Sequence, residues 1–392
     1  MGKFIAPEWQ KYYRYISLGD NLLAVSQKRP IPILLTYDPY NQAVRGRSNF
    51  HVLGRFAFCL VRESGKEWFH DMSDRSHCYH PWGIENSAVC NGNDLAVSLV
   101  SCPLIEENGF LLEVKIENLD NHSHLTRMMT VYGGIASVKQ PRMIPEFSEA
   151  EDDEVILQNN TAILRDKALK EPSIFSFFST NRKVAYKTID SRKTFARGID
   201  GNHGPLVHGE VDLGSIRPHS EKTVFFIVTF DKDCSSGMKN VQMIRNKASE
   251  YQQRTIGYFA SVLDTAKVVS PSRYINQGFE AGLLDLEYTW YKNLGWIEIV
   301  SAWCDLWPQI HIPGVCALRQ LERAKSCLLA HAKTMREDGK VMSLDTGGRP
   351  RAGNEWEHSY INGASHYYNA TNDRDFIEQL WPYLVKMYDY RF

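Results

Sequence analysis

The chain has 392 residues, of which 43% are hydrophobic and 23% charged, and 45 Lys+Arg against 46 Asp+Glu give a net charge of −1. This balance excludes a polybasic protein that binds nucleic acid through bulk charge, and the apolar fraction excludes a disordered acidic chain. No stretch approaches 18 consecutive apolar residues, so the sequence predicts no membrane-spanning helix and no membrane partner. The first residues lack the apolar core of a signal peptide, which predicts a cytoplasmic protein or, alternatively, a periplasmic one whose signal has been removed.

Cysteines and motifs give no sign of a metal or a cofactor. The eight cysteines form no CxxC pair and no Cys/His cluster of zinc spacing, so we expect free thiols rather than a disulfide framework. No GxGxxG, GxxxxGK[ST] or HExxH motif occurs, and the sequence predicts that cofactors are absent. Nine tryptophans and nineteen tyrosines are many for an ordinary chain. Such residues first build cores, but sugar-binding clefts also use them, because the C–H face of a pyranose packs on a flat ring.

Up to about residue 232 the apolar pattern is that of short strands. Alternating or β-branched runs are separated by turn clusters at intervals of roughly 8–15 residues, which is typical of an antiparallel sandwich. Residues 76–86, rich in His, Trp and Glu, are predicted to form a surface loop. The predicted strands cover residues 51–62, 94–102, 110–117, 125–132, 155–164, 174–180, 184–188, 209–213 and 222–230.

From about Ser236 the apolar residues follow a helical period. Residues 238–266 lack proline and predict one long connecting helix, and Ser272 is expected to cap the next one. Trp290 and Trp381 are predicted to lie on core-facing helix stripes, and Pro382 is expected to kink the last helix. The predicted helices after the connecting one cover residues 274–292, 308–318, 320–336, 355–370 and 373–392.

Three motifs carry a family resemblance. They are VKIENL at 114–119 followed by VYGG at 131–134; the segment 209–230 with LGSIRP at 213–218; and DGKV at 338–341, followed by Trp356, HYYNATNDRDF at 366–376 and LWP at 380–382. Their order resembles the six-hairpin (α/α) toroid glycoside hydrolases and phosphorylases that carry an N-terminal β-sandwich, such as bacterial glucoamylase, glycogen-debranching glucosidase and cellobiose phosphorylase. The resemblance implies a multidomain, β-then-α chain: an antiparallel β-supersandwich (1–235), a linker helix (236–271) and an incomplete toroid (272–392).

In such a toroid the loops that enter the inner helices converge and form a cup, into which helix N-termini aim backbone N–H groups. Residues 295–307 and 340–356 are these two loops, and the first also holds Trp296. The predicted substrate-binding residues are Trp303, Trp307, Asp345, Arg349, Glu355, Trp356 and His358. Asp305 and Glu357 are the predicted catalytic carboxyls. Structural roles stay open, because the tryptophans could pack helix ends and both carboxylates could complement helix N-termini.

Glycoside cleavage uses two carboxyls, one to protonate the leaving oxygen and one to activate water or attack the sugar. The resemblance implies that the general acid follows the fifth helix, so we expect it beyond Phe392, the last residue of the sequence. A toroid of about twelve helices would need roughly 150–250 further residues. We therefore expect the N-terminal part of a longer enzyme, whose open helical face is covered by a missing C-terminal portion or by a second copy of the chain.

The predicted function is a glycoside hydrolase acting on oligo- or polysaccharide. The alternatives are a glycoside phosphorylase on the same scaffold, or a non-catalytic carbohydrate-binding protein.

Overall fold

The computed structural model of the chain describes residues 13–18, 21–26, 31–37, 47–133, 136–139, 146–147, 153–166, 174–189, 205–291, 295–296, 303–304, 311–345, 350–351 and 357–391. They belong to two compact units, one made mainly of residues up to Tyr258 and the other mainly of residues from Phe259 onward. We refer to them as the sandwich unit and the helical unit. The predicted domain limits at 235 and 271 remain predictions.

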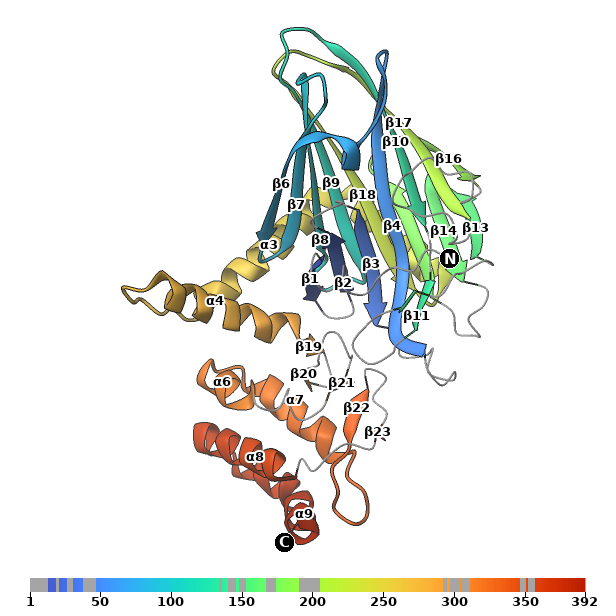
Figure 1. The fold of residues 1–392 in the computed structure, drawn as a ribbon. Helices are drawn as coiled ribbons and strands as arrows, with labels where there is room; N and C mark the ends of the chain where they lie inside the picture. Colours follow the sequence, from blue (N-terminus) through green and yellow to red (C-terminus); the bar gives the residue numbers. More distant parts are fainter. Residues whose placement is uncertain are drawn as a thin grey trace. The chain divides into compact units, whose positions relative to one another are not determined.

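The sandwich unit is built from two antiparallel sheets, as the sequence pattern predicts (Figure 1). The ten-stranded sheet has the order β1 (Tyr13–Leu18), β2 (Asn21–Ser26), β3 (Pro32–Tyr37), β4 (Arg47–Arg62), β10 (His124–Gly133), β17 (Leu206–Ile216), β16 (Val184–Ile189). Strands β5 (Gly65–Trp68) and β11 (Ala136–Lys139) also pair with β4, and β12 (Glu146–Phe147) pairs with β11. The eight-stranded sheet has the order β13 (Asp153–Gln158), β14 (Thr161–Asp166), β15 (Phe175–Thr180), β18 (Glu221–Asp231), β9 (Gly109–Asn118), β8 (Leu95–Pro103), β7 (Gly83–Val89), β6 (Ser73–His80).

Aromatic rings from both sheets meet in the core of this unit. Alternate residues of a strand face the same side, so Phe56 of β4 and Tyr132 of β10 reach the rings of β15 and β18. The ring centroids of Tyr132 and Phe178 are 4.4 Å apart, and those of Phe56 and Phe226 are 4.9 Å apart. The Tyr132 hydroxyl lies 2.7 Å from the Leu53 carbonyl oxygen, to which it donates. The buried polar tip of Tyr132 is therefore paired, as burial requires.

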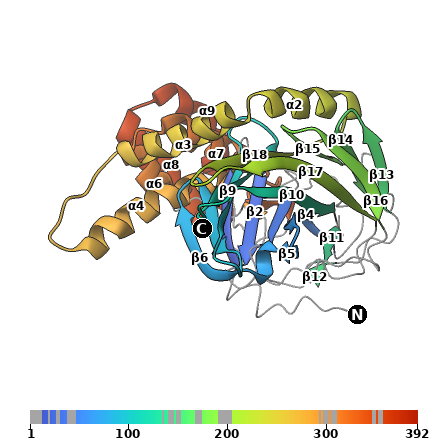
Figure 2. The ribbon, with the colours of Figure 1, turned by 90° about the horizontal axis from the view of Figure 1, so that it is seen from above.

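Two consecutive helices pack on the outer side of the eight-stranded sheet, the second through Ala248 and Tyr251 in its first turns (Figure 2). The first of them, α2 (Cys234–Asn246), is capped by Asp233, whose carboxylate accepts the Ser236 amide at 2.6 Å. Its apolar residues Val241 and Ile244 pack with Cys102 and other buried residues of the sheet. Burial raises the pKa of the Cys102 thiol to about 12, so this cysteine behaves as a small hydrophobe. The seven cysteines whose side chains the structure describes are free thiols.

The prediction of one helix over 238–266 is wrong. The chain forms α2 and then α3 (Ala248–Asp264), separated by Lys247 with φ −132° and ψ 28°. The Lys247 amide donates to the Ile244 carbonyl, which closes the first helix in a tighter turn. Lysine is a good helix former, so composition and apolar spacing contain no sign of this break.

Two predictions within the sandwich are also wrong. Residues 155–164 form β13 and β14 rather than one strand, because Asn159 and Asn160 both take positive φ, 50° and 60°, and make a two-residue turn. Residues 76–86 are the β6–β7 hairpin rather than a loop. At its turn the rings of His80 and Trp82 stack with centroids 4.9 Å apart, and His80 Nε2 lies 3.0 Å from a Glu85 carboxylate oxygen.

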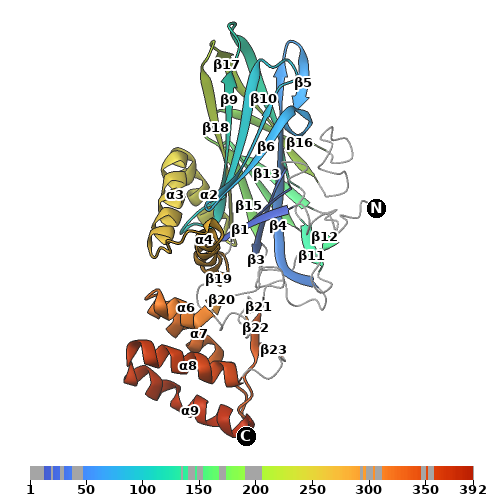
Figure 3. The ribbon, with the colours of Figure 1, turned by 60° about the vertical axis from the view of Figure 1, so that its left-hand side comes forward.

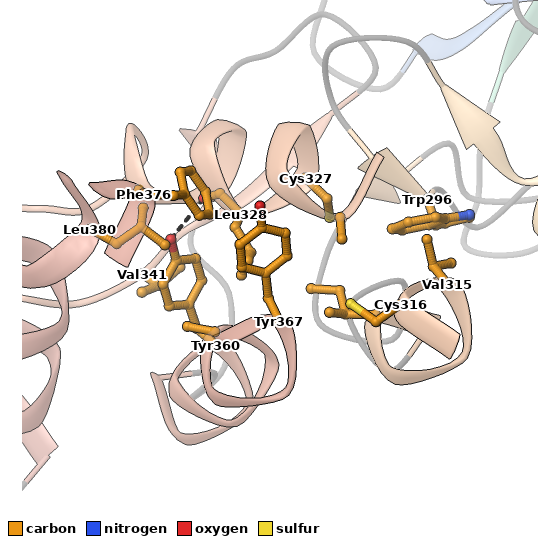
Figure 4. Packing of buried hydrophobic residues seen from close by; sticks show 14 of the residues in the cluster. Trp296, Val315, Cys316, Cys327, Leu328, Val341, Tyr360, Tyr367, Phe376 and Leu380 are labelled. Atoms are coloured by element: carbon orange, nitrogen blue, oxygen red, sulfur yellow. Dashed lines mark hydrogen bonds between the residues drawn. The ribbon is translucent and has the colours of Figure 1, made fainter. Parts of the chain in front are cut away.

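The helical unit contains α4 (Arg273–Tyr288), α6 (His311–Ala317), α7 (Leu321–Ala332), α8 (Glu357–Thr371) and α9 (Arg374–Arg391). Their buried faces form one cluster, in which α8 and α9 pack as an antiparallel pair (Figures 3 and 4). Asp373 caps α9 by accepting the Phe376 amide at 3.0 Å, and the Tyr367 hydroxyl donates to the other oxygen of this carboxylate at 2.9 Å. The apolar period predicts these helices, and their existence is confirmed.

Two tryptophans of the helical half differ from expectation. Trp381 is 60% exposed and is not a core residue. Trp290 lies just beyond α4, in the short strand β19 (Trp290–Tyr291), and is only partly buried against the cluster. Ser272 occupies the N-cap position of α4, as predicted, but its side chain forms no capping hydrogen bond. Among the described residues, no helix is long and apolar enough to cross a membrane.

Candidate functional site

The two loops that hold most of the predicted site residues are joined to each other in the helical unit. Strands β21 (Trp303–Cys304), β22 (Ser343–Asp345) and β23 (Pro350–Arg351) form a three-stranded antiparallel sheet. In its register Trp303 lies directly opposite Asp345, which brings the Cα atoms of such a pair to about 4.5–5.5 Å. One strand comes from the loop at 295–307 and two from the loop at 340–356, so the backbones of both loops meet at this sheet.

A buried tryptophan anchors the base of the first loop. Trp296, in β20 (Gly295–Trp296), is 0% exposed, and its indole N–H donates to the Leu286 carbonyl at 3.1 Å. Its ring packs in the helical core beside Val315 (Figure 4). Its ring centroid lies 4.8 Å from that of Trp290 and 5.9 Å from that of His311. Trp296 is therefore a core residue of the helical unit that fixes where this loop leaves α4.

A buried carboxylate holds the base of the second loop. Glu357, the first residue of α8, is 0% exposed, and its Oε1 accepts the Val341 amide at 3.0 Å. Its Oε2 is buried as well and has no hydrogen-bond partner among the residues that the structure describes. The buried Thr334 hydroxyl holds the neighbouring Met342, whose carbonyl it contacts at 2.7 Å and whose amide it accepts at 3.2 Å. Both contacts fix the loop at the point where it enters the site.

Gly339 makes the turn before this loop possible. It has φ +92°, and a Cβ atom added there would lie 2.1 Å from the Lys386 carbonyl oxygen of α9. A side chain is thus excluded by both backbone conformation and space. The DGKV motif therefore contains a glycine that the packing of α9 requires.

Sequence reasoning missed one titratable pair near the base of the first loop. Asp285 lies near the end of α4 and His311 is the first residue of α6. Burial raises the pKa of Asp285 and lowers the pKa of His311, and the charge of each opposes the shift of the other. A carboxyl with a raised pKa is closer to the range of a general acid. These residues are 26 positions apart, and no motif marked either of them.

The structure places the predicted site residues unequally. Glu357 and His358 stand in the first turn of α8, and His358 is exposed. The backbones of Trp303 and Asp345 lie in the three-stranded sheet. In the part of the chain that the structure describes, no group of three His, Cys, Asp or Glu side chains is arranged to hold a metal ion. The predicted site residues that lie outside the described residues are Asp305, Trp307, Arg349, Glu355 and Trp356.

The predicted general acid is not assigned to any residue of the sequence, because it is expected beyond Phe392. The structure describes α9 as far as Arg391, so Phe392 itself lies outside the described residues. The location of the acid beyond Phe392 stays a prediction. The same holds for the expectation that further chain, or a second copy, covers the open helical face.

The class of fold follows from two features of the chain. A β-sandwich is followed by helical hairpins, and the loops of successive hairpins are joined at one small sheet. No protein-family model and no curated protein matches the chain. Solved structures do match, among them a bacterial glucoamylase in complex with acarbose, at 12% identity and a TM-score of 0.60, over 94% of this chain and 56% of that chain. A protein assigned as a kojibiose phosphorylase from the human microbiome matches at 11% identity and a TM-score of 0.57, over 93% of this chain and 54% of that chain.

At such identities the likeness concerns the fold alone. The chain has the β-sandwich-plus-helix fold of the six-hairpin glycosidases and phosphorylases, as its motifs predict. It spans about half the length of the solved structures that it matches.

Proposed function

We propose that this chain is part of a glycoside hydrolase that cleaves oligo- or polysaccharide by acid/base chemistry between two carboxyls. The observation that carries the proposal is the register of the small sheet, in which Trp303 of one loop lies opposite Asp345 of the other. An aromatic residue and a carboxylate at one point suit a sugar, because the ring can stack on its C–H face and the carboxylate can accept its hydroxyls.

The proposed roles follow the order of the residues along the two loops. Asp305 comes two residues after Trp303 and Glu357 begins α8, so these two carboxyls stand at the two loops that the sheet joins. Asp305 serves as a reacting carboxyl. Glu357 serves either as a second one or by holding the loop through Val341, in which case the general acid lies beyond Phe392. The proposed sugar-binding residues are Trp303, Trp307, Asp345, Arg349, Glu355, Trp356 and His358.

A phosphorylase is the second candidate, because one of the solved structures that match the chain is assigned as a kojibiose phosphorylase. Phosphorolysis would use inorganic phosphate in place of the attacking water on the same scaffold. A third possibility is a protein that binds carbohydrate without cleaving it.

A substrate screen distinguishes these functions. The purified chain, and a form extended beyond Phe392, would be incubated with α- and β-linked oligosaccharides, with and without inorganic phosphate, and the products separated by chromatography. Free sugar without phosphate supports the hydrolase, and sugar phosphate supports the phosphorylase. Turnover by the extended form alone places the missing acid beyond Phe392. Binding without turnover in both forms supports the third possibility, and neither binding nor turnover of any glycan contradicts all three.

A substitution tests the role of Asp305 in whichever form is active. Asp305→Asn should lower kcat by a factor on the order of 10²–10⁴, because asparagine can neither give up nor take up the proton. Exposed Glu337→Gln serves as a matched control and should leave kcat unchanged. Equal kcat for Asp305→Asn and the control would remove Asp305 from the reaction.

Two substitutions separate catalysis by Glu357 from loop positioning. Glutamine keeps an oxygen that can accept the Val341 amide but loses the charge and the acid. If Glu357 reacts with the sugar, both Glu357→Gln and Glu357→Ala should abolish kcat. If it only positions the loop, Glu357→Gln should keep kcat, and Glu357→Ala should raise KM because the loop base is released.

A further inference from the structure

The sandwich unit carries a pocket at the point where α2 ends and α3 begins. Its volume is about 470 Å³, which lies within the range of small-molecule sites in proteins. Its side chains come from β18, from the turn after β15, from the end of α2 and from the first turn of α3: Phe225, Asn181, Arg245, Asn246, Ser249 and Glu250. The pocket forms at the helix break that the apolar period of the sequence does not show.

An aromatic ring from the sheet supplies the apolar part of this pocket. Successive residues of β18 face opposite sides of the sheet. Phe226 packs in the core between the two sheets, so Phe225 faces the outer side, where it packs partly against the cluster under α2. Phe225 is only half-buried, and no other ring among the described residues contacts it. Part of the ring is therefore left for a ligand.

Asn181 is held in place beside this ring. Its backbone amide donates to the Phe225 carbonyl at 3.1 Å, and its side-chain Oδ1 accepts the Phe225 amide at 3.0 Å. Both bonds leave the Nδ2 group, which has two hydrogens to donate. The pocket thus has a polar group next to the ring whose position the backbone of β18 fixes.

Arg245 supplies further donors from the helix side. A guanidinium has five N–H groups, and its one hydrogen bond to another described residue is long, 3.4 Å from Nη1 to the Asn159 carbonyl. Asn246 and Ser249 are exposed at the rim and can both donate and accept. Donors and acceptors therefore stand on two sides of the half-buried ring.

The charges around the pocket favour a neutral ligand over an anion. Lys247 Nζ lies 3.3 Å from a carboxylate oxygen of Glu250, so these two charges compensate each other. The Glu250 carboxylate disfavours an anion but accepts hydrogen bonds from hydroxyl groups. A ring, a guanidinium, amides and a carboxylate together match the C–H face and the vicinal hydroxyls of a sugar.

We infer that this pocket is a second carbohydrate-binding site, which holds a neutral oligosaccharide on the sandwich unit. A pyranose packs its C–H face on Phe225, and its hydroxyls bond to Asn181 and Arg245. The inference goes beyond the proposed function, because it concerns another site and binding alone. It holds whether or not the loops of the helical unit cleave a sugar.

Isothermal titration calorimetry of the purified chain tests the inference, with neutral hexasaccharides of glucose, mannose, galactose and xylose as probes. At least one probe should bind with a Kd on the order of 0.1–1 mM, because one ring and a few hydrogen bonds give modest affinity. Bound probe should also slow hydrogen exchange in the segment 245–250.

Two variants locate the binding. Phe225→Leu keeps an apolar side chain but loses the flat ring, and Arg245→Met keeps the apolar stem but loses the donors. Each should weaken binding about tenfold or more. Arg127→Met, at a 58% exposed arginine side chain of the ten-stranded sheet, is the matched control and should bind as the wild type does. Circular dichroism checks that each variant is folded, and Arg245→Met alone decides the test if Phe225→Leu unfolds.

Three outcomes overturn the inference. The first is binding that the folded pocket variants leave unchanged, which is the result expected if sugar binds only at the loops of the helical unit. The second is no binding of any probe up to about 10 mM. The third is competition by inorganic phosphate at constant ionic strength, which would make the pocket an anion site. The kcat values of the Asp305 variants report on the proposed function separately.

Discussion

The two units differ in how completely their own elements cover their apolar side chains. In the sandwich unit, rings from both sheets pack against one another, and α2 covers the outer side of the eight-stranded sheet. Its exposed large hydrophobics lie on several elements, as at Tyr79 on β6, Leu125 on β10 and Met243 on α2. In the helical unit, α9 gathers three of them on one line, at spacings i, i+4 and i+7: Trp381, Val385 and Tyr388.

The difference suggests separate roles for the two units, one in stability and one in the candidate site. The sandwich unit stabilises itself through a closed aromatic core. The helical unit carries the candidate site on loops and leaves large apolar side chains of α9 exposed. Changes in the sandwich core should therefore act on global stability, while changes in the helical unit should act locally and on the loops that its helices hold.

The largest expected effect is in the sandwich core. Phe178→Ala removes a ring that contacts Phe56, Tyr132, Tyr186 and Phe226, and should lower the free energy of unfolding by about 3–5 kcal/mol, because a cavity remains. Urea unfolding followed by hydrogen exchange and mass spectrometry would report each unit separately. Ile275→Ala, at a residue of α4 that is 57% exposed, is the control and should change stability by less than about 0.5 kcal/mol. Equal losses for both variants would contradict the comparison.

The next effect is in the helical unit, at a glycine. Gly339→Ala combines a positive φ with a contact of 2.1 Å to a backbone oxygen of α9, so we expect a loss of about 3 kcal/mol. Faster hydrogen exchange should be confined to α7, α9 and the loop between residues 340 and 356. Gly257→Ala, inside α3 with no atom within 4 Å of the added Cβ, is the matched control and should be neutral or stabilising by up to about 1 kcal/mol.

The order of the fold could be predicted because the apolar period changes from that of strands to that of helices near Ser236. Local breaks could not be predicted as well. The Asn159–Asn160 turn lies inside an apolar run, and Lys247 interrupts a helical pattern with a residue that favours helices. The prediction for Trp381 is wrong because a second apolar stripe on a helix looks like a wider core face in sequence.

The candidate site could be predicted at the level of loops but not of contacts. The motifs imply that two loops meet, and they do so at the strands of Trp303 and Asp345. Their register depends on pairing across about forty residues, which local patterns do not encode. The bond from Glu357 to Val341 likewise closes a loop of 16 residues, and only the packing of α8 determines which backbone amide it meets.

One buried tyrosine in each unit allows the hydrogen bonds of the two cores to be compared. The Tyr132 hydroxyl bonds the Leu53 carbonyl at 2.7 Å and the Ser176 hydroxyl at 2.8 Å. The Tyr360 hydroxyl donates to the Leu328 carbonyl at 2.8 Å. Tyr132→Phe should cost about 1.5 kcal/mol, because it leaves two buried groups with fewer partners. Tyr360→Phe should cost about half as much, because the Leu328 carbonyl keeps its bond within α7. Chemical denaturation of both variants measures this, and a larger loss for Tyr360→Phe would refute the argument.

The smallest expected effect is a dependence of sandwich stability on pH. His208 is 6% exposed on β17, and no other residue in the described part of the chain forms a hydrogen bond with its Nδ1. Burial lowers the pKa of His208, and the nearby charges of Lys187 and Lys66 lower it further, while Glu210 opposes them. As pH falls below about 6.5, the ordinary value for histidine, the unfolded chain therefore takes up a proton that the folded chain does not. The contribution of His208 to the free energy of unfolding is therefore fully present above neutral pH. It is lost as the pH falls toward the pKa of His208 in the folded state.

This histidine can contribute a slope of at most one proton, about 1.4 kcal/mol per pH unit. Urea midpoints measured from about pH 7.5 down to pH 5 should fall less steeply in His208→Gln than in the wild type, because glutamine does not titrate in this range. His358→Gln, at an exposed position of α8, is the control and should follow the wild-type curve. Parallel curves for His208→Gln and the wild type would mean that His208 takes up its proton equally in the folded and the unfolded chain. The acid sensitivity of the sandwich would then arise from other groups.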